Sequence, residues 1–242
     1  VFSTVLAEAQ TFSSRDTATG NYNQFWMVDR DWDLRTSLVT DPRNGRLPAV
    51  TAAADAVRAT RAAARNRHAR GPEDRSLGER CISWGVPRLG AGYNSYTQVF
   101  QSAGHVVLYM EMGGSRVIPL DAGPHVDEGI RQMHGDSRGH FEGDTLVIDT
   151  TNYSMTGSFM ESSDGLHLVE RLTLVAEDAL QYEVTITDPK TWDAPWSAMV
   201  PLKRSTDPVF EYACHEGNIG MEGIMSGARA LEKAEADSGG QQ

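Results

Sequence analysis

The segment MHGDSRGHFEGDTLVIDTTN (133–152) concentrates side chains that can bind ions or transfer protons. Within eleven positions ahead of a strand it places His134, Asp136, Arg138, His140, Glu142 and Asp144. We interpret it as a loop at the mouth of a β-barrel, where Arg138 binds an anionic or carbonyl oxygen and Asp136 orients a partner. The alternative is ordinary turn chemistry, because turns favour Asp and Gly.

A second such segment is YACHEGNIGMEG (212–223), in which a predicted strand ends and a glycine-rich turn begins. His215 is a candidate catalytic residue, since an imidazole is suited to proton transfer near neutrality. Adjacent strand residues point to opposite faces, so His215 and Glu216 are not expected to act on the same atom. The alternative is a structural histidine.

The parity of one predicted hairpin places Glu170 in the interior. LVERLTLV and LQYEVTIT pair around a loop at 176–179. An odd loop puts Leu168, Glu170 and Leu172 on one face with Tyr182 and Val184, and gives the other face a polar, solvent-facing pattern. A carboxyl group among leucines is costly unless it is paired. Glu170 is therefore either a general acid or base, or half of a buried pair.

Aromatic side chains flank the predicted strands where a ligand would enter. Tyr93 and Tyr96 precede the first barrel strand, and Trp192 and Trp196 lie between two later ones. With Tyr182 they form the predicted substrate-binding set, because such rings stack on planar ligands. The alternative is that the rings close the end of the barrel.

No sequence motif supports a metal or a cofactor. The seven histidines are scattered and match no His-x-His or His-Glu-x-x-His spacing. No segment matches a nucleophilic serine elbow, a dinucleotide loop or a phosphate loop. We therefore predict that the protein uses neither a metal nor a cofactor.

Period-two runs predict a mainly β protein. The predicted strands span 36–40, 97–102, 105–112, 116–120, 141–151, 168–175, 180–187, 197–203 and 209–214. Their short connections require antiparallel pairing. A lipocalin-like antiparallel barrel at 97–214 is the most economical arrangement, and a closed two-sheet sandwich is the alternative.

The remaining segments frame this barrel in one predicted domain, 1–242. An extended N-terminal arm covers 1–48. A surface helix covers 51–70, with Thr51 as N-cap and Gly71-Pro72 as the stop. The C-terminal tail at 223–242 contains the short helical piece ARALEKAEA.

The composition restricts the classes of partner that the protein is expected to bind. A net charge of −11 argues against binding to nucleic acid or anionic lipid. The arginines at 58–70 alternate with alanines and lack stacking aromatic residues, as on a solvated helix face. No run approaches the roughly 18 apolar residues of a membrane span, so membrane insertion is not expected. The oligomeric state is left open.

Cys81 and Cys214 are the only two cysteines. They either form one disulfide in an oxidising compartment or are small buried hydrophobic residues.

Four segments together are similar to a widespread, largely uncharacterised family of exported bacterial β-rich proteins. They are RSLGERC (75–81), GDSRGHFEGDTLV (135–147), LHLVERLT (166–173) and YACHEGNIGMEG (212–223), and the similarity extends over about 41–229. It implies a periplasmic or secreted location and assigns no catalytic residue.

These observations favour a cofactor-independent acid/base enzyme, a lyase, isomerase or hydratase, acting on a small, partly aromatic molecule. Its predicted catalytic residues are Glu170, His215, Asp136 and Arg138. The alternatives are a carrier of a hydrophobic ligand and an interaction module of the cell envelope. Convergence of Glu170, His215 and Arg138 on one pocket would favour the enzyme.

Overall fold

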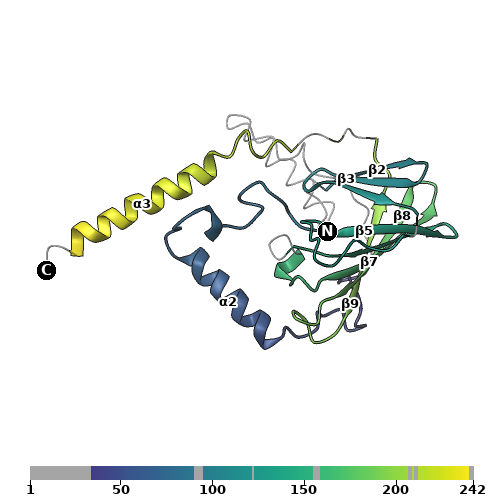
Figure 1. Ribbon diagram of the computed structural model, residues 1–242, viewed down its shortest axis with the longest axis horizontal. Helices are drawn as coiled ribbons and strands as arrows, with labels where there is room; N and C mark the ends of the chain where they lie inside the picture. The colour runs from purple at the N-terminus through teal and green to yellow at the C-terminus, as the bar shows by residue number, and fades with distance from the viewer. Residues whose placement is uncertain are drawn as a thin grey trace.

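The computed structural model describes residues 34–89, 95–121, 123–154, 159–206, 209 and 212–239. In this part of the chain the strands form two antiparallel sheets (Figure 1). The larger has the strand order β1-β9-β8-β7-β6-β5, and the smaller has the order β2-β3-β4. The strands are β1 Val39–Asp41, β2 Thr97–Ser102, β3 His105–Met110, β4 Gly114–Pro119, β5 Asp136–Glu142, β6 Thr145–Thr151, β7 His167–Ala176, β8 Ala179–Thr187 and β9 Trp196–Lys203.

One hydrophobic core joins the two sheets. Alternate residues of β3 and β4, such as Val106, Leu108 and Ile118, share this core with β6, β7 and β8 of the large sheet. Gly139 shows how closely the sheets approach, because a Cβ atom there would lie 2.8 Å from Cγ2 of Ile118. Only glycine therefore lets β4 lie this close to β5.

The prediction of a mainly β, antiparallel fold is confirmed. Within the described residues the hydrogen-bonded strands do not close into one barrel, so the lipocalin-like part of that prediction is not confirmed.

Two segments differ from their predicted conformation. Residues 136–140, predicted as a loop before a strand at 141–151, belong to β5, which pairs with β6 from Asp136↔Thr151 to Glu142↔Thr145. The run GDSRGHFEGD contains several residues that are typical of turns, and one face of the strand is polar. The alternation of apolar and polar residues that indicates a strand is therefore difficult to recognise in it. The predicted strand at 209–214 is not found, since its described residues, 209 and 212–214, are not in a strand.

The predicted surface helix is α2, Ala52–Asn66, and Thr51 is its N-cap as expected. The Thr51 side chain accepts a hydrogen bond from the Ala54 amide at 3.2 Å and donates one to the Lys190 carbonyl at 2.6 Å. The second bond ties the helix to the turn before β9. Two 3-10 turns, η2 Pro72–Asp74 and η3 Phe159–Glu161, complete the described short elements.

Replacing Thr51 by alanine should lower the free energy of unfolding by about 1–2 kcal/mol, because it removes both bonds. Urea unfolding followed by circular dichroism measures this. Thr60→Ala is the matched control: its hydroxyl bonds only the Ala56 carbonyl within the same helix, and alanine favours a helix. Equal stability of the two variants would contradict the capping role.

The C-terminal segment is helical over a longer stretch than predicted. The helix α3 runs from Ile219 to Gly239 and leads away from the sheets (Figure 1). The first half of α3 contains three glycines, at 220, 223 and 227. Because glycine has a low helix propensity, the sequence did not indicate a helix there. Arg229 fastens α3 to the chain after α2 by donating to the Ala69 carbonyl at 2.6 Å.

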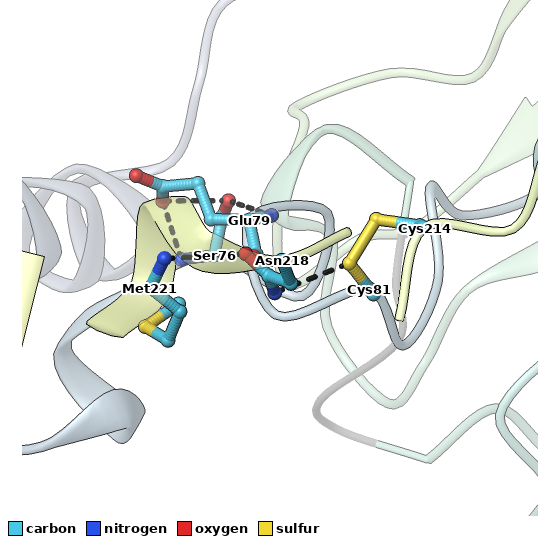
Figure 2. Close-up of a disulfide and its surroundings, with 6 residues drawn as sticks. All are labelled: Ser76, Glu79, Cys81, Cys214, Asn218 and Met221. Carbon is cyan, nitrogen blue, oxygen red and sulfur yellow. Dashed lines mark hydrogen bonds between the residues drawn. A yellow bond between two sulfur atoms is a disulfide. The ribbon is translucent and has the colours of Figure 1, made fainter. Parts of the chain in front are cut away.

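Cys81 and Cys214 form a disulfide with their Cα atoms 5.5 Å apart, which decides between the two alternatives. Figure 2 shows Asn218 beside it. The side-chain amide of Asn218 donates from Nδ2 to Sγ of Cys81 at 3.2 Å. Its Oδ1 accepts a hydrogen bond from the backbone amide of Met221 in the first turn of α3. The disulfide and the cap together fix where α3 begins. A disulfide is compatible with an extracellular or periplasmic location.

Among the described residues, no helix has both the length and the apolar character needed to cross a membrane.

Candidate functional site

The register of β7 and β8 places Glu170 in the interior, as its parity predicts. Glu170 pairs with Val184, and Leu172 pairs with Tyr182. Glu170 is 1% exposed. The connection differs in detail from the prediction: Ala176 pairs with Ala179, and a register shift between Leu174 and Ala176 restores the expected faces. The interior position of Glu170 is confirmed.

A buried arginine of the opposite sheet neutralises this carboxylate. Arg116 on β4 donates from Nη1 to Oε1 of Glu170 at 3.0 Å and from Nη2 to Oε2 at 2.6 Å. The Tyr182 hydroxyl donates to Oε1 of Glu170 at 2.7 Å. Arg116 Nη2 also donates to the hydroxyls of Ser137 and Thr150. We call these five residues the buried polar cluster; its ion pair links the two sheets.

The charges in this cluster are stabilised by one another. Burial disfavours the charge of Arg116, but the adjacent Glu170 more than offsets this, and the pKa of the guanidinium is raised above its ordinary value. Burial, followed by the charge of Glu170, raises the pKa of the Tyr182 hydroxyl well above its ordinary value. Tyr182 therefore keeps its proton and acts as a hydrogen-bond donor.

The cluster borders a cavity of about 60 Å³ between the sheets, which we call the inter-sheet cavity. Its polar wall contains Arg116, Glu170 and Tyr182. The rest of the lining is largely apolar and includes two further charged residues, Arg88 and Glu111. The other lining residues are Ser95, Tyr96, Thr97, Leu108, Met110, Met112, Leu172 and Leu202. A largely apolar cavity with a few converging polar groups is typical of small-molecule sites.

One donor in this wall is unused. The buried Nε of Arg116 has no hydrogen-bond acceptor among the described residues. Unsatisfied buried donors are rare in folded proteins, because each carries the full cost of its desolvation. Nε is therefore the one nitrogen of the Arg116 guanidinium that the described residues leave without a partner.

Comparisons of the chain with family models, with curated proteins and with solved structures found no match. In the described residues, no group of three or more His, Cys, Asp and Glu side chains is placed to hold a metal ion.

Asp136 and Arg138 lie on the outer face of β5, opposite the side of Ser137, and not at a cavity mouth. Arg138 Nε donates to Oδ2 of Asp136 at 3.2 Å, and Nδ1 of His125 lies 2.8 Å from the same oxygen. Burial alone would raise the pKa of the Asp136 carboxyl. Hydrogen bonds from His125 and Val126 and the charge of Arg138 outweigh this effect and lower the pKa below its ordinary value. Asp136 and Arg138 thus lie on the face of the large sheet opposite to that of Glu170.

His215 is exposed in the turn before α3, where its carbonyl accepts a hydrogen bond from the Asn218 amide. Glu170, Arg138 and His215 therefore do not converge on one pocket. His134 lies nearer the interior, with Nε2 2.9 Å from the Ser83 hydroxyl. Burial, and secondarily the charge of Arg116, lower the pKa of the His134 imidazole.

The predicted aromatic set divides into two parts. Tyr96 and Tyr182 line the inter-sheet cavity. Trp192 and Trp196 are 2% exposed and pack edge to face, with ring centroids 5.7 Å apart. They belong to the hydrophobic core and do not line the inter-sheet cavity. Tyr93 lies outside the described residues.

Arg116 is the residue that the sequence analysis missed. It lies in the run GSRVIP, where its side chain shares a face with Ile118. A buried carboxylate requires a cationic or hydrogen-bonding partner. An arginine at an inward position of a neighbouring strand was the signal that could have identified it.

Proposed function

We propose that this protein binds a small molecule in the inter-sheet cavity. The ligand presents a neutral carbonyl or hydroxyl oxygen to Arg116 and places its apolar part against Leu108, Met110 and Leu172. The observation that carries the proposal is the composition of the cavity wall, where Arg116, Glu170 and Tyr182 meet apolar side chains and where Arg116 has one buried donor without a partner among the described residues. A ligand held between strands is also what the lipocalin-like prediction implies.

Charge balance favours a neutral ligand. Glu170 already neutralises Arg116, and the cavity lining contains one further arginine, Arg88, and one further glutamate, Glu111, so its formal charges balance. A carboxylate ligand would add an uncompensated charge to a buried site. A neutral acceptor satisfies the Arg116 donor without that cost.

The cavity size limits which part of the ligand is enclosed. A volume of about 60 Å³ is several times that needed for one water molecule, and well below the roughly 300–1,000 Å³ of pockets that enclose drug-sized ligands. The enclosed part is thus a group of a few atoms, and the rest of the ligand lies at the entrance near Leu202.

Acetophenone should bind at least tenfold more tightly than ethylbenzene, which has a similar shape but no oxygen. A hydrogen bond from a charged donor contributes about 1.5–3 kcal/mol, and 1.4 kcal/mol corresponds to a factor of ten. Ligand-observed NMR titration of the full chain measures both affinities. Leu202→Trp should abolish binding by filling the cavity edge, whereas Val117→Trp, at a 60% exposed position of β4, should not. Equal affinity for both compounds would refute the role of Arg116.

The acid/base enzyme is the second candidate, because Glu170 and Tyr182 both line the cavity and lie 2.7 Å apart. Its mechanism requires Glu170 to exchange a proton during each turnover. Both carboxylate oxygens of Glu170 are already engaged, by the two Nη atoms of Arg116 and the hydroxyl of Tyr182. This geometry is the reason for preferring a binding function.

A further inference from the structure

A second cavity, of about 260 Å³, lies on the outer face of the large sheet. We call it the outer groove. It is lined by Thr40, Asp41, Val169, Arg171, Glu183, Thr185 and Ser197. These side chains come from β1, β7, β8 and β9, and they point away from the buried polar cluster. The outer groove is therefore separate from the inter-sheet cavity.

The register explains why these side chains gather. Val169 pairs with Thr185, and Thr185 pairs with Ser197, so their side chains form one row across three strands. Arg171 pairs with Glu183 in the next row. Asp41 of β1 pairs with Ser197 and extends the first row.

The N-terminal strand supplies a fixed wall for this groove. Arg35 donates to the Met199 carbonyl at 3.1 Å, and the Met199 amide donates to the Leu38 carbonyl at 2.9 Å. The Ser37 hydroxyl donates to the Gly45 carbonyl at 2.8 Å and closes the turn after β1. The wall that presents Thr40 and Asp41 is thus held at both ends.

Much of the hydrogen-bonding capacity of the groove is unused. Glu183 accepts one bond, from the Gln181 amide at 2.9 Å, although a carboxylate accepts about four. No described residue donates to the Asp41 carboxylate in a hydrogen bond that the structure shows. Thr185 and Ser197 bond each other at 2.9 Å, and this leaves one of the two hydroxyl protons available. Arg171 bonds Glu142 through one nitrogen and has further N–H groups.

We propose that the outer groove binds a neutral polyhydroxylated compound, such as a sugar ring. The carboxylates of Asp41 and Glu183 accept hydroxyl protons, and Arg171 donates to ring or hydroxyl oxygens. Val169 provides an apolar contact for the C–H face of the ring. Two carboxylates against one arginine, already paired with Glu142, give the groove an acidic character that disfavours anions.

Saturation-transfer NMR with the methyl glycosides of glucose, galactose and mannose tests this on the full chain. At least one should show transfer to its ring protons, with a dissociation constant in the millimolar range. Glucuronate should show weaker transfer, because its carboxylate meets those of the groove. No transfer from any of the three glycosides at tens of millimolar would overturn the proposal.

Variants locate the site. Glu183→Ala and Asp41→Ala should each weaken glycoside binding about tenfold or more, since each removes a charged hydrogen-bond acceptor. Both positions are on the surface, so the variants are expected to fold, as circular dichroism would verify. Leu202→Trp blocks the inter-sheet cavity and should leave glycoside binding unchanged, so the two proposals can fail independently. Glycoside binding that survives both groove variants would contradict the assignment.

Discussion

Replacing Glu170 by glutamine is expected to lower the free energy of unfolding by about 3–5 kcal/mol. The variant keeps the shape of the side chain but leaves the buried charge of Arg116 without its counterion. Arg116 and Glu170 are 4% and 1% exposed, so bulk water does not screen the charge that is left behind. Urea unfolding of the full chain, monitored by intrinsic tryptophan fluorescence, measures the change.

The matched control is Glu142→Gln. Glu142 forms a contact of the same length, 2.6 Å, with Arg171, but both side chains are well exposed. This exposed pair contributes at most about 1 kcal/mol, because water and salt screen it. If the two glutamine variants lost equal stability, the buried pair would not have the role we assign to it.

The triple variant Arg116→Met, Glu170→Leu, Tyr182→Phe should recover most of the stability that Glu170→Gln loses. It replaces the ion pair and the attached hydroxyl with apolar groups, so no buried charge is left unpaired. The Ser137 and Thr150 hydroxyls bond each other at 3.0 Å and remain satisfied without Arg116. For an acid/base enzyme, in contrast, Glu170→Gln would keep nearly normal stability and lose about 10²-fold or more in turnover.

Replacing Cys81 and Cys214 by serine is expected to lower the free energy of unfolding by about 2–5 kcal/mol. The disulfide joins positions 133 residues apart, so it restricts a large loop of the unfolded chain. The loss should be accompanied by faster amide hydrogen exchange in α3, whose start the disulfide holds. Chemical unfolding and exchange mass spectrometry measure the two effects.

Asn218→Ala is the control for this variant. It removes the cap of α3 and the amide bond to Sγ of Cys81, but it leaves the covalent link intact (Figure 2). Its cost should be about 1 kcal/mol, as for a helix cap. A double serine variant as stable as the parent chain would show that the disulfide does not restrain the fold.

The interior position of Glu170 could be predicted because alternation in β7 and β8 is strict. Shifting the pairing by one residue would bring Arg171 and Glu183 into the core, so the faces are strongly determined. The predicted loop was nevertheless inexact, since the register shift after Leu174 compensates for a shorter turn. Local periodicity thus determined the face of Glu170 and not the turn geometry.

The partners of Glu170 could not be predicted in the same way. Arg116 meets Glu170 from the other sheet, 54 positions earlier in the chain, and such a contact depends on how the sheets stack. Residues 136–140 were misread as a loop for a related reason. The outward residues are charged, and the inward residues include Ser137, which serves Arg116, and Gly139, which makes room for Ile118. The roles of Ser137 and Gly139 depend on contacts with the opposite sheet, so the sequence of this segment alone does not reveal them.

Methyl-resolved NMR during titration with acetophenone tests most directly whether the inter-sheet cavity is the binding site. The account predicts chemical-shift changes confined to the cavity-lining methyl groups, those of Leu108, Met110, Met112, Leu172 and Leu202. The methyl groups of Val169, which line the outer groove, should not shift. Shifts at Val169 with none at Leu108 and Leu172, or no shifts at saturating ligand, would contradict the account.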